Sequence, residues 1–275
     1  MASHALAVAG FEIPLESGLR IQGEVRVLED GRRKPVVLLG HGFRGHRLWS
    51  FWPEVARRFA EQGYYTVSFD FSRIAAEEDQ LDAKAVAEAA TFGRELADWE
   101  ALVSRLRSEG LGMNDEADSE RIAVLGHSRA AGSGLLFAAR RTEARAFIAW
   151  NGGVSSPLAP VIPDGIAPSL RDQAIIADLE RNADRYDVYG AYDDLPIPAL
   201  VVQGGADHER LLKAVSGLQE AYPDHSVVWI PGADHTFGAK HPYEGFTKHL
   251  EEAFDHSIRF LRRAFADQEN RRDPL

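Results

Sequence analysis

The chain has 275 residues, of which 45% are apolar and 27% charged, and its formal net charge is −11. The negative charge and the lack of a basic stripe argue against a nucleic-acid partner, because neutralising phosphates needs clustered Lys and Arg. Without cysteine, disulfides and thiolate chemistry are excluded, and any metal site would need His and carboxylates.

The first part of the chain is predicted to form a β-hairpin followed by a buried strand. Strands over residues 11–16 and 19–27 are joined at Ser17-Gly18, a pair suited to a tight turn. The run over residues 35–39 is apolar without polar alternation, which is typical of a strand covered on both faces.

After residue 40 the pattern alternates between strands and helices, as in β-α units with right-handed crossovers. We expect strands over residues 64–70, 121–126, 145–150, 198–203 and 226–230, and helices over residues 53–62, 84–108, 129–141, 209–222 and 246–266. In the longest helix, Leu96, Trp99, Val103 and Leu106 form one apolar stripe that should pack on the sheet. The sequence therefore predicts an α/β protein, a single domain over residues 1–275, with a mostly parallel sheet of about eight strands and helices on both faces.

One segment, residues 154–196, breaks this alternation. It contains prolines at 157, 160, 163, 168 and 196 around an amphipathic stretch near residues 170–184. Loops of this length usually carry function. We predict a small lid over the carboxyl ends of the strands, where ligands bind in open α/β folds.

The apolar stretches are too short for a membrane span. The longest, near residues 130–139, is bounded by Arg129 and Arg140 and falls well short of about 20 residues. The first ten residues lack the basic region and the apolar length of a secretory signal. We expect a cytoplasmic protein with no membrane partner.

The strongest local signal is Gly126-His127-Ser128-Arg129-Ala130, which lies between a predicted buried strand and a predicted helix. This is the pattern of a nucleophile elbow, in which the serine occupies a sharp turn. Small residues are needed at 126 and 130 because neighbouring backbone crowds the turn, and Ala130 stands where glycine is usual. The alternative is that Ser128 merely caps a helix.

A serine hydroxyl needs a base, and histidine has the right intrinsic pKa. His235 follows the last predicted strand, where a loop can reach back to the elbow. The acid should lie between Ser128 and the histidine in sequence. Asp207, just after the strand at 198–203, fits that order, and Asp234 is its rival, although side chains adjacent in sequence usually diverge. Surface positions suit the remaining candidates better: His208, His225, His241, His249 and His256.

An oxyanion hole needs two backbone N–H groups. One is predicted at Arg129, directly after the serine, and the other at Phe43, in the glycine-rich loop over residues 40–45. That loop could also be taken for a phosphate cradle, but it lacks the spacing of glycines and the Gly-Lys-Ser/Thr of such motifs.

Three further residues are weaker candidates for substrate binding. His41 and His127 flank the site, but a buried, hydrogen-bonded histidine would serve structure equally well at either position. Trp150 ends a strand and is a candidate for the pocket wall. The acidic run Glu77-Glu78-Asp79 is interpreted as solvated surface, and no metal is predicted.

The chain resembles bacterial α/β-hydrolases grouped with dienelactone-hydrolase-like esterases and S9-type peptidases. Four motifs carry this resemblance: Gly42-Phe43, the elbow at 126–129, Ala206-Asp207 and Asp234-His235. The resemblance spans nearly the whole chain. It implies an α/β-hydrolase fold, a triad of Ser128, Asp207 and His235, and oxyanion donors at Phe43 and Arg129. Dienelactone hydrolases proper use a cysteine nucleophile, and this chain has none.

The expected function is that of a serine hydrolase acting on a small-molecule carboxylic ester, with small to medium acyl chains, through an acyl-enzyme and without a cofactor. Cleavage of amides by an S9-type peptidase, lactonase activity and thioesterase activity remain open. From a different class, the chain could be a non-catalytic relative that acts as a binding module, although such relatives commonly lose a triad residue.

Overall fold

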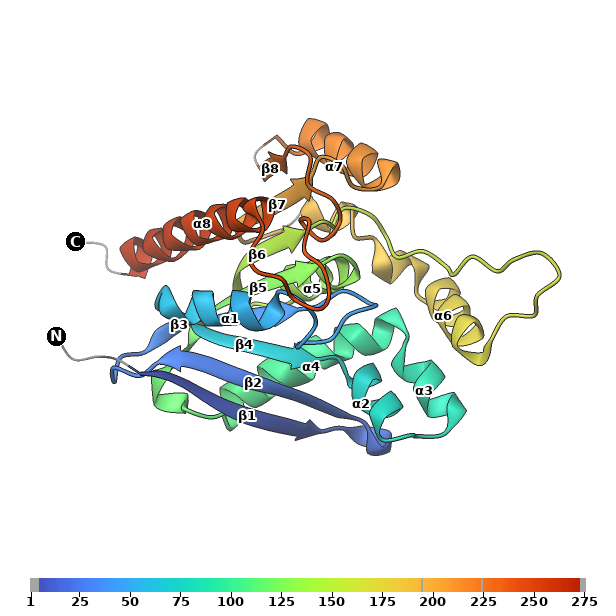
Figure 1. The fold of residues 1–275 in the computed structure, drawn as a ribbon, viewed down its shortest axis with the longest axis horizontal. Coiled ribbons are helices and arrows are strands. Elements are labelled where there is room, and N and C mark those ends of the chain that lie inside the picture. Colours follow the sequence, from blue (N-terminus) through green and yellow to red (C-terminus); the bar gives the residue numbers. More distant parts are fainter. Residues whose placement is uncertain (1–4, 194, 224, 273–275) are drawn as a thin grey trace.

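A single eight-stranded sheet forms the centre of the computed structural model, which describes residues 5–193, 195–223 and 225–272 (Figure 1). Its strands are β1 (Leu6–Pro14), β2 (Arg20–Leu28), β3 (Lys34–Gly40), β4 (Tyr65–Asp70), β5 (Ala117–His127), β6 (Ala144–Trp150), β7 (Ala199–Gly204) and β8 (Ser226–Ile230). They are ordered β1-β2-β4-β3-β5-β6-β7-β8. β2 pairs antiparallel with both β1 and β4, and every other pair is parallel. The predicted mostly parallel sheet is confirmed.

Helices cover both faces of this sheet, as predicted (Figure 1). One face is covered by α1 (Trp52–Glu61) and α8 (Lys248–Arg272), and the other by α4 (Phe92–Ser108), α5 (Arg129–Arg140) and α7 (Glu209–Ala221). The predicted stripe on α4 is buried against the sheet, with Trp99 fully enclosed. None of the described helices is long and apolar enough to cross a membrane.

Between β4 and β5 the structure corrects two details. The helix predicted over residues 84–108 is two helices, α3 (Ala83–Ala89) and α4, because the hydroxyl of Thr91 accepts the N–H of Arg94 and begins a new helix. An additional helix that the sequence did not predict, α2 (Ser72–Glu78), ends in the acidic run at 77–79. The side chains of this run are exposed, and Asp79 pairs with Arg20.

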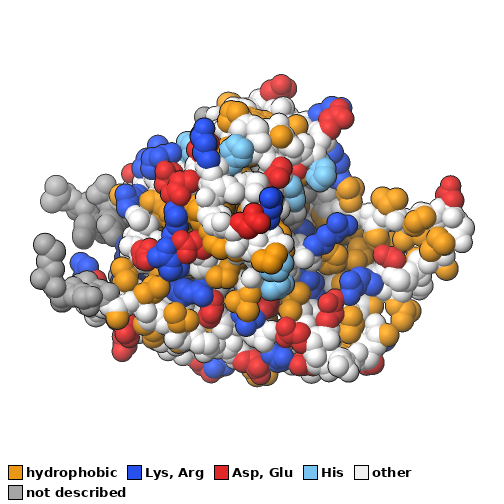
Figure 2. Space-filling model, viewed as in Figure 1, with side chains coloured by type: hydrophobic (Ala, Val, Ile, Leu, Met, Phe, Trp, Pro, Cys, Tyr) orange, Lys and Arg blue, Asp and Glu red, His pale blue; other side chains and the backbone are white. Residues whose placement is uncertain are grey.

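The segment between β6 and β7 has two parts. Residues 154–169 form a loop that extends away from the body, and hydrophobic side chains such as Val161 are exposed along it (Figures 1 and 2). α6 (Leu170–Arg181) follows and packs on α3 and α4. On α6, Asp178 accepts hydrogen bonds from the N–H of Gly93 and the hydroxyl of Tyr186. The helix is therefore tied to the body, unlike the loop before it.

Parallel pairing brings the carboxyl ends of β3, β5, β6 and β7 to the same edge of the sheet. Gly40 at the end of β3 pairs with Gly126 at the end of β5. The loops that follow these strands, and the loop after β8, carry the polar residues singled out from the sequence.

Candidate active site

Ser128 lies in the turn between β5 and α5, in a backbone conformation that residues with a side chain rarely adopt, with φ 57° and ψ −123°. Its N–H donates to the carbonyl oxygen of Trp150 at 2.9 Å. A Cβ at Gly126 would lie 2.3 Å from the carbonyl oxygen of Ala130, and one at Gly152 would lie 2.2 Å from that of Ser128. Glycine is therefore required at 126, within the turn, and at 152, in the loop after β6 that lies against it, and the surrounding backbone holds the strained serine in place.

Ser128, His235 and Asp207 are joined by hydrogen bonds. Nε2 of His235 lies 2.9 Å from Oγ of Ser128, and Nδ1 lies 2.9 and 3.1 Å from the two carboxylate oxygens of Asp207. The Asp207 side chain is fully buried, whereas the His235 side chain is 30% exposed. A hydroxyl, an imidazole and a carboxylate in this order can pass a proton from the serine to the histidine while the carboxylate orients the ring.

Asp207 is ionised at neutral pH because its carboxylate accepts several hydrogen bonds. Burial opposes ionisation, but hydrogen bonds from His235, from the N–H of His208 and from the amide of Gln203 outweigh it and hold the pKa of Asp207 below its usual value. An anionic carboxylate can only accept a hydrogen bond, so Nδ1 of His235 must carry the proton, and this tautomer leaves Nε2 free to accept.

Asp234 is oriented differently. Its carboxylate accepts the N–H groups of Thr236 at 3.0 Å and Gly238 at 2.6 Å, within its own loop. The structure thus places Asp207, and not Asp234, against the ring of His235.

The loop that carries His235 is held in place by hydrogen bonds to the backbone carbonyl oxygen of His235. The oxygen of His235 accepts hydrogen bonds from Nε2 of His127 at 2.8 Å and from Nδ2 of Asn151 at 2.9 Å. Asn151 is fully buried, and its Oδ1 accepts the N–H of Gly204 at 2.7 Å. Burial lowers the pKa of His127 to about 4, so this histidine is neutral at pH 7 and its proton lies on Nε2. Asn151 was not predicted, although a polar residue followed by two glycines at a strand end is a usable signal.

The loop that carries the predicted donor Phe43 lies against the serine, and the predicted donor Arg129 directly follows it in sequence. Gly42, which precedes Phe43, lies so close that a Cβ on it would be 3.3 Å from Cβ of Ser128. Arg129 is the first residue of α5, where backbone N–H groups have no partner within the helix.

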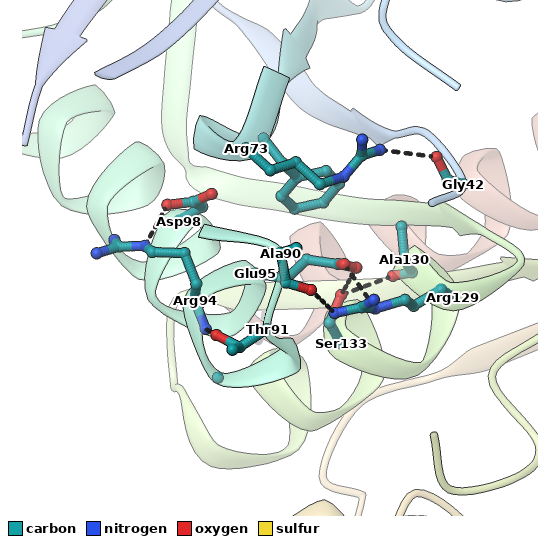
Figure 3. A network of polar contacts seen from close by, with 12 residues as sticks. Gly42, Arg73, Ala90, Thr91, Arg94, Glu95, Asp98, Arg129, Ala130 and Ser133 are labelled. Atoms are coloured by element: carbon teal, nitrogen blue, oxygen red, sulfur yellow. Dashed lines mark hydrogen bonds and ion pairs between the residues drawn. The ribbon is translucent and has the colours of Figure 1, made fainter. Parts of the chain in front are cut away.

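The side chain of Arg129 is turned away toward α4 (Figure 3). Its Nε lies 3.0 Å from the buried carboxylate of Glu95, and Nη2 donates to the carbonyl oxygen of Ala90 at 2.9 Å. Glu95 also accepts the hydroxyl of Ser133 at 2.7 Å. The charge of Arg129 is therefore neutralised, and its guanidinium lies 4.3 Å from the ring centre of Phe43.

A cavity of about 480 Å³ opens beside Ser128 and His235, within the usual size range of small-molecule sites. Its apolar wall comes from α4, from the start of the projecting loop, from α6 and from α7. The large apolar residues of the wall are Phe92, Leu158, Ile175, Leu179 and Leu211. Its polar wall includes His208, which is exposed as predicted and whose ring centre lies 5.7 Å from that of His235.

The three weaker candidates do not line this cavity. Trp150 is fully buried, and its Nε1–H donates to the hydroxyl of Ser257. His127 holds the loop of His235, and His41 is 1% exposed with Nδ1 2.9 Å from the carbonyl oxygen of Gly42. All three belong to the framework around the site, and we do not propose them as substrate-binding residues. Among the described residues, no group of three His, Asp or Glu side chains is placed to hold a metal ion.

A mostly parallel sheet that brings a serine, an aspartate and a histidine together from its strand ends is the architecture of the α/β-hydrolases, and this chain is one of them. The model of the dienelactone hydrolase family matches residues 24–265. The chain therefore belongs to the dienelactone hydrolase family and is a hydrolase.

Solved structures with the same fold cover nearly the whole chain. Est1E from Butyrivibrio proteoclasticus matches with a TM-score of 0.68 at 19% identity, covering 94% of this chain and 99% of that one. A dienelactone hydrolase from Anabaena variabilis matches with 0.61 at 17%, covering 94% and 99%. A hyperthermophilic esterase from Pyrobaculum calidifontis matches with 0.65 at 19%, covering 94% and 84%. A comparison with curated protein sequences found no significant match.

Proposed function

We propose that this hydrolase cleaves carboxylic esters of small to medium acyl chains through an acyl-enzyme on Ser128. The observation that carries the proposal is the continuous hydrogen bonding from the hydroxyl of Ser128 through His235 to the buried carboxylate of Asp207, beside a largely apolar cavity. Because the chain has no cysteine, the serine of the elbow takes the position of the nucleophile.

In the proposed reaction, Oγ of Ser128 attacks the ester carbonyl carbon while Nε2 of His235 takes the hydroxyl proton. Asp207 stabilises the imidazolium that forms. The backbone N–H groups of Phe43 and Arg129 donate to the oxyanion. As the tetrahedral intermediate collapses, His235 gives its proton to the alkoxide of the leaving alcohol. His235 then deprotonates a water that attacks the acyl carbon, and it returns this proton to Oγ of Ser128 as the bond between the acyl carbon and Oγ breaks and the carboxylic acid leaves.

The size of the cavity and its apolar wall support short and medium acyl groups. Est1E has a structure with ferulic acid bound. An aromatic ester such as methyl ferulate therefore belongs in a substrate panel for this chain, beside aliphatic esters, an amide, a lactone and a thioester.

A fluorophosphonate should add one label to the protein, at Ser128, as measured by intact mass and peptide mapping. Ser128→Ala should take no label and should lose on the order of 10⁶ in kcat on p-nitrophenyl butyrate, as in other triads. A protein that takes no label and turns over no ester would contradict the proposal, and a label at another serine would move the site.

A further inference from the structure

We propose that Arg73 is a positioning residue for the oxyanion hole, because its guanidinium, together with His41, binds the carbonyl oxygen of Gly42 and so orients and polarises the peptide unit that carries the N–H of Phe43. This inference rests on the proposed function. It adds residues on two other elements to the machinery around Ser128.

Arg73 lies in the first turn of α2, directly after β4, and its side chain reaches the loop that follows β3 (Figure 3). The residue is 7% exposed. Its Nη2 donates to the carbonyl oxygen of Gly42 at 3.2 Å and to that of Gly45 at 3.0 Å. One guanidinium therefore binds the loop at two points, one on each side of Phe43.

The charge of Arg73 is not used in an ion pair. In Figure 3 two neighbouring arginines each bind a carboxylate: Arg94 pairs with Asp98 and Arg129 with Glu95. In the described part of the chain, by contrast, no carboxylate pairs with Arg73. A buried guanidinium is costly unless its charge is balanced or hydrogen-bonded, and an arginine does not escape that cost by losing its proton. The carbonyl oxygens of the loop are therefore its hydrogen-bond acceptors, while the carboxylates of Glu95, Glu77 and Asp70 act on its charge from a longer range.

His41 is a second donor to the same oxygen. Its Nδ1 lies 2.9 Å from the carbonyl oxygen of Gly42, and its Nε2 lies 3.4 Å from the backbone nitrogen of Phe71, so a proton on Nδ1 satisfies both contacts. Burial holds the pKa of His41 well below its usual value, so the ring is neutral. The carbonyl oxygen of Gly42 thus accepts from two neutral donors, His41 and the N–H of Gly45 at 2.9 Å, and from one cationic donor, Arg73.

The two sides of one peptide unit are electronically linked. A carbonyl oxygen that accepts a charged hydrogen bond draws electron density from the amide nitrogen, which makes the N–H on the opposite side a stronger donor. That N–H belongs to Phe43, and Gly42 itself lies against Ser128. Arg73 and His41 therefore hold the predicted donor in one orientation before substrate binds, which is the condition under which an oxyanion hole is effective.

The first test reads the peptide unit directly and does not depend on activity. Labelling glycine with carbonyl ¹³C and phenylalanine with ¹⁵N selects the Gly-Phe pairs of this sequence, which are Gly10-Phe11, Gly42-Phe43 and Gly245-Phe246. In Arg73→Met the ¹⁵N signal of Phe43 should move upfield, and in Arg73→Lys it should move less. The other two signals should stay where they are, as internal controls. A Phe43 signal that does not move would overturn the proposal whatever the kinetics show.

The second test separates positioning from structural support. Arg73→Met should lower kcat on p-nitrophenyl butyrate about tenfold, because loss of a whole oxyanion donor costs about 10²–10³-fold and here the donor is weakened but kept. KM should stay within about twofold, and Arg73→Lys should recover part of kcat. Arg94→Met is the matched control, since it removes a neighbouring guanidinium that does not touch the loop, and it should leave kcat unchanged even if the melting temperature falls.

The outcomes assign failure to one proposal or the other. A wild-type kcat in Arg73→Met, or an equal loss of kcat in Arg94→Met, would overturn the role of Arg73. A wild-type protein that takes no fluorophosphonate and cleaves no ester would overturn the proposed function, and the Phe43 signal would still report whether Arg73 polarises this peptide.

Discussion

At the scale of single residues, we expect opposite effects on kcat from replacing the two aspartates near His235. Asp207→Asn should lower kcat by about 10⁴-fold, because an amide cannot stabilise imidazolium and favours the wrong tautomer of the ring. Asp234→Asn should keep kcat within about tenfold, because the carboxylate of Asp234 binds N–H groups of its own loop. Both variants are assayed on p-nitrophenyl butyrate after a thermal melt has shown that they fold. An inactive Asp234→Asn beside a normal Asp207→Asn would assign the acid to Asp234.

The low pKa of His127 should make the free energy of unfolding depend on pH. Its pKa is about 4 in the folded chain, below the usual histidine value of 6.5. Between these pH values the unfolded chain binds a proton at this site and the folded chain does not, so stability falls as the pH falls from about 6.5 to about 4. The loss attributable to His127 is at most about 3 kcal/mol. Above about pH 6.5 the folded and unfolded chains both hold His127 neutral, so its full contribution to the free energy of unfolding is present.

The variant His127→Gln isolates this contribution. Glutamine keeps an N–H donor for the carbonyl of His235 and does not titrate, so the difference in free energy of unfolding between wild type and variant should change across this pH window. Buried His41 contributes with the same sign in both proteins and cancels from the difference. Urea unfolding at closely spaced pH values measures it, and parallel curves for the two proteins would contradict the assignment.

At the scale of elements, α6 should set the length of the acyl chain. Ile175 and Leu179 lie one turn apart on this helix, and both line the cavity. Leu179→Trp should therefore lower kcat/KM for p-nitrophenyl octanoate about tenfold while leaving the acetate ester nearly unchanged, since a larger side chain shortens the space available. Leu170→Trp is the control, because Leu170 lies on the same helix but is 55% exposed. Equal effects from both substitutions would show that α6 does not limit the cavity.

Elements marked by one clear pattern, such as a continuous apolar run, were predicted from the sequence. Elements whose residues carry conflicting signals, such as a helix period interrupted by a cap, were not. The buried strands were found because continuous apolar runs are hard to mistake. The break between α3 and α4 was missed because the helical period continues through Ala90, and only the cap at Thr91 interrupts it. α2 was missed because its last residues are acidic and exposed.

The same distinction applies to the candidate site. Ser128, Asp207 and His235 could be singled out because each follows a strand, and parallel strands end at one edge. Ile175 and His208 reach the cavity only through the packing of α6 and of the loop after β7, which no local pattern encodes. Arg73 gave no signal at all, because a lone arginine in a helix is usually a surface residue.

At the scale of the whole molecule, the size of the cavity beside Ser128 predicts a limited substrate range. In a series of p-nitrophenyl acetate, butyrate, octanoate and palmitate, kcat/KM should be highest for a short chain and lowest for palmitate. The segment between β6 and β7, residues 154–196, is small beside the caps of many long-chain lipases, and the cavity that it helps to line holds about 480 Å³. The esters are compared below their aggregation limits. A maximum at palmitate would overturn this expectation.

The origin of the cavity wall also matters for how this protein can change. The groups proposed to break the bond stand at strand ends of the central sheet, whereas Leu158, Ile175 and Leu179 belong to the segment inserted between β6 and β7. Mutations in that segment alter which substrate fits without moving the strand ends. Directed evolution confined to residues 155–158 and 175–179 should therefore change which substrates bind while it leaves the geometry of the proposed catalytic residues unchanged. Substrate selectivity can then change without a loss in the rate of bond cleavage.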